Sequence, residues 1–123
     1  MDLSILSRNV RGLNNPAKRR VVQIFVSDLK CNIVCLQETK LNDPSNGLVV
    51  EALGPRFKDN FISLPANGSR GGVLIACNED FEIKNDPSAA GDFSVSGTTR
   101  CRANGESWSI SGVYGRQLEE EKV

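Results

Sequence analysis

The segment Ile33-Val34-Cys35-Leu36-Gln37-Glu38-Thr39-Lys40 decides how this sequence folds. Its first four residues form a continuous apolar run, which is typical of a strand that is covered on both faces. A polar turn begins at Glu38, so a carboxylate stands directly at the end of that strand. The fold class then depends on the elements that precede and follow this buried strand.

A shorter strand and an amphipathic helix precede it. Residues 3–7 are predicted to form a strand, and Asn9 follows its end. Asn15 is a natural N-cap and Pro16 suits the first helical position, after which apolar residues recur at helical spacing through Lys30. The order strand, helix, strand is a βαβ unit, whose strands run parallel with a right-handed crossover. The sequence therefore predicts an α/β fold.

The elements that follow extend this unit. A short helix is predicted over residues 47–53 and ends at Gly54-Pro55, and a flexible turn is predicted to include Gly71 and Gly72. Further strands are predicted over residues 61–64, 73–77, 81–84, 93–99 and 107–114. We expect the helix of residues 16–30 to pack on one sheet that contains residues 3–7, 33–37, 73–77 and 107–113.

Composition limits the class of protein. The 123 residues fit one domain, and 39% hydrophobic with 24% charged residues is ordinary globular composition. The net charge is zero, which disfavours a globally basic nucleic-acid binder. Residues 1–40 nevertheless carry seven basic and three acidic side chains, so this part of the chain could meet phosphates, although a solvated surface explains the same charges.

The cysteines and the N-terminus indicate an intracellular protein, in the nucleus or the cytoplasm. Cys31 and Cys35 straddle the start of a strand, and four residues of extended chain separate them by about 13 Å, too far for a disulfide. The chain has no histidine and no Cys-x-x-Cys pair, so a structural zinc site is not expected. It also shows no secretory signal and no stretch that is apolar enough to span a membrane.

Three polar side chains are predicted to converge at one edge of the sheet. Asn9, Glu38 and Tyr114 each stand at the end of a strand, and ligands of such sheets bind beyond the carboxyl ends of parallel strands. A carboxylate there is a suitable oxygen ligand for Mg²⁺, and an asparagine can orient a water or a phosphate oxygen without adding charge. A lone glutamate after a strand can equally be a solvated or loop-anchoring residue.

Four strings in the sequence resemble, in the same order, motifs of the endonuclease/exonuclease/phosphatase superfamily. They occupy residues 4–13 (SILSRNVRGL), 33–40 (IVCLQETK), 69–75 (SRGGVLI) and 112–115 (GVYG). The sequence is most similar to endonuclease domains of plant-type non-LTR retrotransposons, which resemble apurinic/apyrimidinic endonucleases. The resemblance implies an α/β fold, half of a four-layer sandwich with a mixed sheet and flanking helices, truncated before its second sheet is complete. Residues 1–116 would be the N-terminal part of that domain, and residues 117–123 an acidic tail where the next helix would start.

The resemblance also implies roles for individual residues. Glu38 would ligate Mg²⁺, Asn9 would help to hold the nucleophile or the phosphate, and Tyr114 would donate a hydrogen bond to the scissile phosphate. These three would form the catalytic group, while Arg11 and Lys40 would contact the nucleic acid, which is DNA in the parent family.

The sequence departs from the family pattern at several points. Arg8 stands where the family usually has tryptophan, Arg11 where apurinic endonucleases have an acidic residue, and Arg116 where a proline is usual. The family's Gly-Asp-x-Asn string and Asp-His pair are expected after the tyrosine strand, and neither occurs in this sequence. Residues 91–94 (GDFS) lie before that strand and have serine in place of asparagine.

Three functions remain open at this point. The chain could be a truncated, inactive relic of a Mg²⁺-dependent endonuclease, a nuclease portion that a further segment or a partner completes, or a non-catalytic nucleic-acid-binding module. The missing motifs count against the second function, and zero net charge with 6% aromatic residues counts against the third. We also expect self-association, because the sheet face that carries residues 73–77, Trp108 and Ile110 would lack a covering sheet.

Overall fold

The computed structural model describes residues 3–67, 70–86 and 94–113, and within these ranges the βαβ unit is confirmed. The first sheet has the strand order β1-β2-β4-β3. Strand β1 pairs parallel with β2, whereas β4 pairs antiparallel with both β2 and β3, so the sheet is mixed. These strands are β1 (Ile5–Asn9), β2 (Ile33–Gln37), β3 (Phe61–Asn67) and β4 (Arg70–Cys77).

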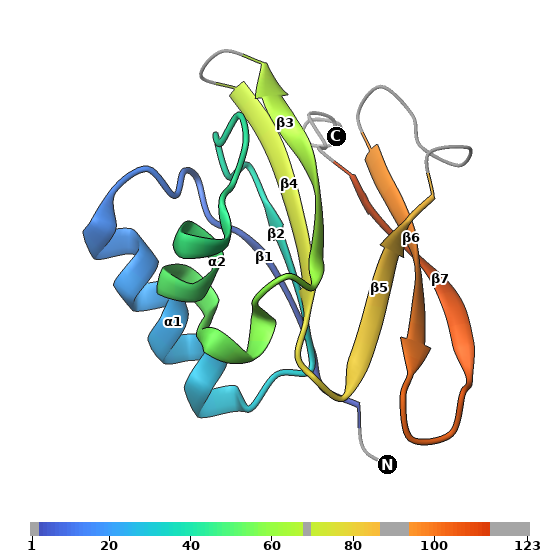
Figure 1. The fold of residues 1–123 in the computed structure, drawn as a ribbon. Helices are drawn as coiled ribbons and strands as arrows, with labels where there is room; N and C mark the ends of the chain where they lie inside the picture. The colour runs from blue at the N-terminus through green and yellow to red at the C-terminus, as the bar shows by residue number, and fades with distance from the viewer. Residues whose placement is uncertain (1–2, 68–69, 87–93, 114–123) are drawn as a thin grey trace, which may run out of the picture.

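Two helices cover one face of this sheet (Figure 1). Helix α1 (Pro16–Leu29) begins as predicted, because the Asn15 side chain accepts a hydrogen bond of 2.8 Å from the Ala17 amide. Helix α2 (Asn46–Leu53) is capped by Ser45 and is followed by a 3₁₀ turn, η1 (Pro55–Phe57). The core of this layer is formed by apolar residues of both helices and of the central strands, including Val22, Val26, Val49, Leu53, Val34, Leu36 and Leu74.

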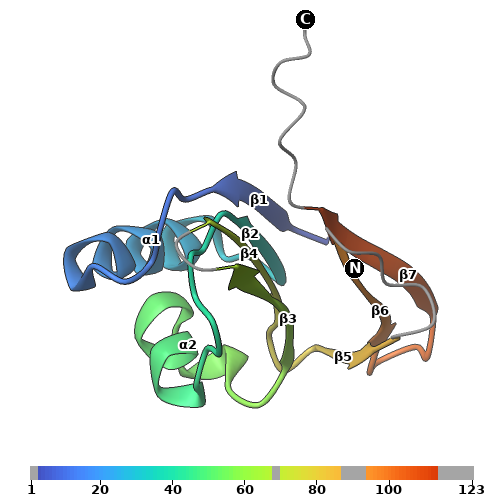
Figure 2. The same cartoon turned by 90° about the horizontal axis from the view of Figure 1, so that it is seen from above.

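A second, three-stranded antiparallel sheet covers the other face (Figure 2). It consists of β5 (Phe81–Asn85), β6 (Ser94–Cys101) and β7 (Ser107–Val113) in that order. The prediction that residues 107–113 join the first sheet was therefore wrong. Their alternation of Trp108 and Ile110 with polar residues suits a sheet with one solvated face, and periodicity cannot say which sheet such a strand joins.

The second sheet also removes the reason for which self-association was expected. Ile33, Val73 and Ile75 are fully buried on the face opposite the helices, where Phe81, Val95, Cys101, Trp108 and Ile110 pack against the same cluster. The described part of the chain thus supplies its own covering sheet, and it forms three layers of helices, mixed sheet and antiparallel sheet. The expectation of an uncovered inner face was wrong.

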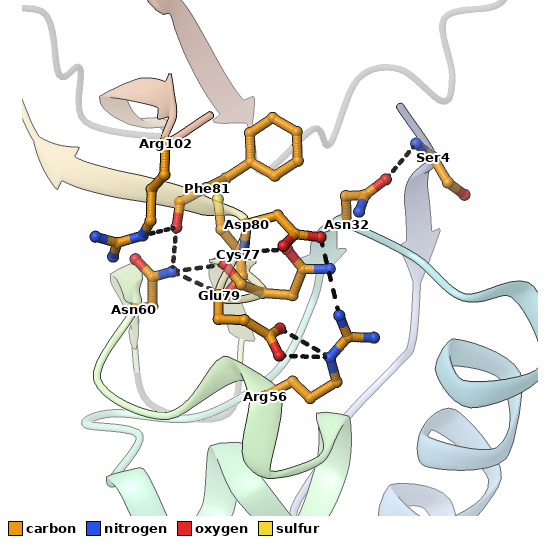
Figure 3. Close-up of polar contacts among 10 residues, drawn as sticks. Ser4, Asn32, Arg56, Asn60, Cys77, Glu79, Asp80, Phe81 and Arg102 are labelled. Atoms are coloured by element: carbon orange, nitrogen blue, oxygen red, sulfur yellow. Dashed lines mark hydrogen bonds and ion pairs between the residues drawn. The ribbon is translucent and has the colours of Figure 1, made fainter. Parts of the chain in front are cut away.

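Asn60 joins the two sheets at the corner where β4 leads into β5 (Figure 3). Its Nδ2 donates to the carbonyl oxygens of Cys77, Asn78 and Phe81 at 3.1, 3.0 and 2.9 Å, and its Oδ1 accepts from the Ile83 amide at 3.1 Å. One side chain therefore bonds to four backbone groups at the point where the chain changes sheet.

The structure also places the four cysteines and the Gly71-Gly72 pair. All four cysteines are buried and free, as the spacing of Cys31 and Cys35 predicted. Gly71 and Gly72 lie inside β4, so the prediction of a flexible turn at these residues was wrong. In the described residues, no helix is long and apolar enough to cross a membrane.

Candidate functional site at the ends of β1 and β2

Asn9 and Glu38 meet where the two parallel strands end. The register pairs Asn9 with Gln37, so Glu38 follows one residue beyond the strand and stands beside Asn9. The Asn9 Nδ2 donates a hydrogen bond of 2.8 Å to Glu38 Oε2. The Asn9 Oδ1 accepts one of 3.1 Å from the Arg11 amide, so both ends of this amide are engaged. Asn9 and Glu38 therefore lie side by side, as the sequence predicted.

The loops that follow the two strands are held together by backbone hydrogen bonds. The amides of Val10, Gly12 and Leu13 donate to the carbonyl oxygens of Gln37, Glu38 and Thr39 at 2.9, 2.7 and 2.8 Å. The loops are therefore anchored to one another for several residues beyond the sheet.

Three non-glycine residues in these loops adopt left-handed backbone conformations. They are Arg11 (φ 53°), Glu38 (φ 54°) and Lys40 (φ 59°). Such conformations each cost on the order of 1–3 kcal/mol and persist only where the surrounding structure enforces them. Residues of this kind cluster at functional sites, so the strained backbone marks the same place as the side chains.

Gly72, on β4, contacts the loop that follows β2 and contains Glu38. The amides of Thr39 and Lys40 donate to the carbonyl oxygens of Gly72 and Gly71 at 3.1 and 2.8 Å. A Cβ on Gly72 would lie 2.4 Å from Thr39 Oγ1, and its φ of +94° also favours glycine. This supporting role was not predicted from the sequence, although the Gly-Gly string within residues 69–75 was the signal that could have identified it.

Basic residues lie around the Asn9–Glu38 pair. Arg11 and Lys40 stand on the two loops, and Lys40 approaches the first loop closely, with its Cδ 3.4 Å from where a Cβ on Gly12 would lie. Lys18 reaches in from α1, where its Nζ donates 2.8 Å to the carbonyl oxygen of Val10. The structure thus brings the predicted nucleic-acid contacts, Arg11 and Lys40, to the same end of the sheet, and it adds Lys18.

Strand β7 reaches the same end of the sandwich. A Cβ on Gly112 would lie 2.6 Å from Val73 Cγ1 and 3.1 Å from Cys35 Sγ, and Val73 pairs with Gln37. Tyr114, the third predicted catalytic residue, lies outside the described residues, as do Arg116 and residues 91–93.

The residues at this site do not form a complete Mg²⁺ centre. Within the described ranges, no three His, Cys, Asp or Glu side chains gather closely enough to hold a metal ion. Glu38 is the carboxylate that follows β2, and the Asn9 amide oxygen already accepts a hydrogen bond from the Arg11 amide. Since Mg²⁺ requires near-octahedral oxygen ligation, most of its ligands would have to come from water or from a bound phosphate.

The α/β sandwich is similar in fold to an apurinic/apyrimidinic (AP) endonuclease. The crystal structure of the AP endonuclease LMAP from Leishmania major matches the chain with a TM-score of 0.66 and 15% sequence identity. The match covers 95% of this chain and 42% of that structure, so the chain spans less than half of the length of this neighbour. No protein-family model matches the sequence, and no curated protein matches it either. At this identity, the similarity establishes the fold.

Proposed function

We propose that this chain derives from a Mg²⁺-dependent phosphodiesterase of the retrotransposon endonuclease type and does not cleave DNA by itself. The observation that carries the proposal is the Asn9–Glu38 hydrogen bond at the ends of two parallel strands, on an AP-endonuclease-like fold. A carboxylate and an amide in this position suit a site that once oriented a metal ion and a phosphate. On this proposal Mg²⁺ would be the cofactor and DNA the substrate of the parent enzyme.

The chemistry of the residues present supports the proposed lack of cleavage. The chain contains no histidine, and the Gly-Asp-x-Asn string of the parent family is missing from its sequence. Loss of a positioned general base typically removes about 10²–10⁴-fold of rate. With one carboxylate at the site, the metal would also be held too weakly to polarise a phosphate consistently.

A cleavage assay tests this proposal. The purified 123-residue chain is incubated in excess over a duplex with one abasic site, with MgCl₂ or with EDTA, beside the Glu38→Ala variant. We expect the same background with all three samples. Mg²⁺-dependent product that disappears in the Glu38→Ala variant would contradict the proposal, and would favour a nuclease portion that retains activity.

Binding of a nucleic-acid phosphate is the second candidate function. Arg11 and Lys40 stand on the two loops that follow β1 and β2, and Lys18 reaches the first of these loops from α1. If these cations contact phosphates, the affinity for DNA should fall as salt rises, with a slope of about −0.9 per neutralised phosphate. Replacing Arg11 and Lys40 by glutamine should weaken fluorescence-anisotropy binding of a short duplex, whereas replacing Arg100 and Lys84 on the second sheet should not. Equal effects from both pairs would indicate nonspecific charge attraction.

A further inference from the structure

Two side chains of α1 reach back to the loop that precedes the helix. Lys18 and Arg19 lie close to the start of α1, which begins at residue 16. The Lys18 Nζ donates a hydrogen bond of 2.8 Å to the Val10 carbonyl oxygen, and the Arg19 Nη1 donates one of 2.8 Å to the Leu13 carbonyl oxygen. We call residues 10–13, which these two carbonyl groups bound, the Arg11 loop.

The Arg11 loop is also held from the side of β2. The amides of Val10, Gly12 and Leu13 donate to the carbonyl oxygens of residues 37–39 at 2.9, 2.7 and 2.8 Å. The loop is therefore fastened twice, through its amides to the end of β2 and through its carbonyl groups to α1. Arg11 has a left-handed backbone with φ 53°, which a non-glycine residue keeps only where the surrounding structure enforces it. Both sets of contacts together enforce that conformation.

The Arg19 guanidinium is itself fixed from α2, which lies beside α1 (Figure 2). Its Nε stands 3.0 Å from Glu51 Oε2, and this contact is an ion pair without the geometry of a hydrogen bond. A guanidinium presents its donors in a rigid planar fork, so one side chain can bridge the Leu13 carbonyl group and Glu51. The Arg19 side chain is only 14% exposed, so most of it is out of reach of a bound nucleic acid.

The helix itself does not favour cations at these positions. The dipole of a helix is positive at its N-terminus, where acidic residues are stabilising, and the first turn of α1 contains none. Lys18, Arg19 and Arg20 instead follow one another near the start of the helix. Departures from such local rules are expected at functional sites. For Lys18 and Arg19, the contacts with the Arg11 loop supply the compensating interaction.

From these contacts we propose that Arg19 is a positioning residue for phosphate binding, because it holds the Arg11 loop so that the Arg11 side chain can meet a nucleic-acid phosphate at the ends of β1 and β2. The inference rests on the second candidate function, phosphate binding, and adds a residue that acts through Arg11. Since the loop is ordered in advance, less conformational freedom is lost when Arg11 binds. Glu51 keeps the guanidinium in place from α2.

Fluorescence-anisotropy titration of a short duplex with the full 123-residue chain tests the effect on binding. Arg19→Gln should raise the Kd about threefold to tenfold, because the Arg11 loop must then be ordered on binding. Arg20→Gln is the matched control, since it removes the same charge from the next, exposed residue, and at physiological salt its Kd should stay within about twofold of wild type. In an Arg11→Gln background, Arg19→Gln should have no further effect, whereas two independent charges would add.

Hydrogen exchange of the Gly12 and Leu13 amides, measured by NMR without DNA, reports on the loop itself. Both amides should exchange faster in Arg19→Gln than in wild type, and Arg20→Gln should leave them unchanged. Arg19→Lys keeps the charge but lacks the fork, so its binding should weaken only as far as its amide exchange accelerates. Far-ultraviolet circular dichroism verifies that each variant is folded.

The outcomes separate this inference from the function on which it rests. If the wild-type chain does not bind the duplex in a salt-dependent manner, phosphate binding fails and the positioning role fails with it. Three results would overturn the positioning role alone: salt-dependent binding that Arg19→Gln leaves unchanged, additive effects of Arg11→Gln and Arg19→Gln, or weaker binding by Arg19→Gln with unchanged amide exchange.

Discussion

Asn9 Nδ2 lies 2.8 Å from Glu38 Oε2. This hydrogen bond joins the ends of two parallel strands, although Asn9 and Glu38 are 29 positions apart in the sequence. The bond forms because the βαβ crossover brings both strand ends to one edge of the sheet, and because the loops beyond them are fastened by three backbone hydrogen bonds. The fold therefore holds a carboxylate and an amide together through its own backbone and side-chain hydrogen bonds.

Replacing Asn9 by alanine should have a small effect on stability. The pair is exposed to solvent, so its net contribution should be about 0.5–1.5 kcal/mol. Urea unfolding of Asn9→Ala, compared with Asn42→Ala at another exposed asparagine, measures this difference. A loss of more than about 3 kcal/mol would show that the Asn9 side chain has a larger structural role than its hydrogen bonds indicate.

Gly72→Ala should destabilise the protein through Thr39. The new Cβ would lie 2.4 Å from Thr39 Oγ1, and alanine is disfavoured at φ +94°. We expect a loss of roughly 2–4 kcal/mol, from backbone strain together with displacement of the Glu38 loop. Gly105→Ala is the control, because its φ is +75° and no atom lies within 4 Å of the added Cβ. If the two variants unfold at the same urea concentration, the contact with Thr39 has no cost.

Asn60→Ala should be more destabilising than its partial exposure indicates. The side chain makes four hydrogen bonds to the backbone at the corner between the sheets, of which those to Cys77 and Phe81 are seen in Figure 3. Alanine would remove all four, although the carbonyl groups of Asn78 and Phe81 would each keep one further bond. The expected loss is about 2–4 kcal/mol, with a lower melting temperature in calorimetry. Asn104→Ala, in the exposed turn before β7, should cost less than about 1 kcal/mol. A similar effect in both variants would show that water replaces the Asn60 bonds.

The buried thiols make stability fall at alkaline pH. Burial raises the pKa of Cys35 to about 11 and the pKa of Cys77 to about 12, from an ordinary value of 9.0. Below pH 9 both states keep these thiols protonated, so the native state has its full stability. Between pH 9 and about 11 the unfolded chain loses these protons and the native state does not, so the free energy of unfolding should decrease.

Thiol chemistry measures the same burial. At neutral pH a disulfide reagent such as Ellman's reagent should react slowly with the native chain and rapidly in denaturant, because the thiolate is the reactive species. Cys35→Ala and Cys77→Ala together should flatten the alkaline loss of stability. Reaction of Cys35 or Cys77 in the native chain at the rate of a free thiol would contradict the buried placement.

The local part of the fold could be predicted from the sequence. Asn15 and Pro16 fixed the start of α1, and the continuous apolar run from Ile33 identified a central strand, because capping and burial depend on neighbouring residues. The position of Glu38 beside Asn9 also follows from the βαβ order alone. These features need only short-range pattern and the handedness of the crossover.

The pairing of distant strands could not be predicted in the same way. Residues 107–113 alternate in a manner that fits either sheet, and their place in the second sheet depends on β6, with which they pair. The role of Gly72 was also missed, because a glycine pair reads as a turn until the loop that approaches it is known. The Arg8–Phe25 contact likewise joins two elements that sequence spacing does not relate.

Titration of Mg²⁺ into the chain tests the central claim most directly, namely that the fold retains a strand-end carboxylate without a complete metal centre. Isothermal titration calorimetry is performed on the wild type and on Glu38→Gln, which keeps the size of the side chain and removes its charge. We expect no saturable binding in either protein at submillimolar Mg²⁺, because no three His, Cys, Asp or Glu side chains of the described residues gather closely enough to hold the ion. Stoichiometric binding by the wild type that Glu38→Gln abolishes would contradict the account.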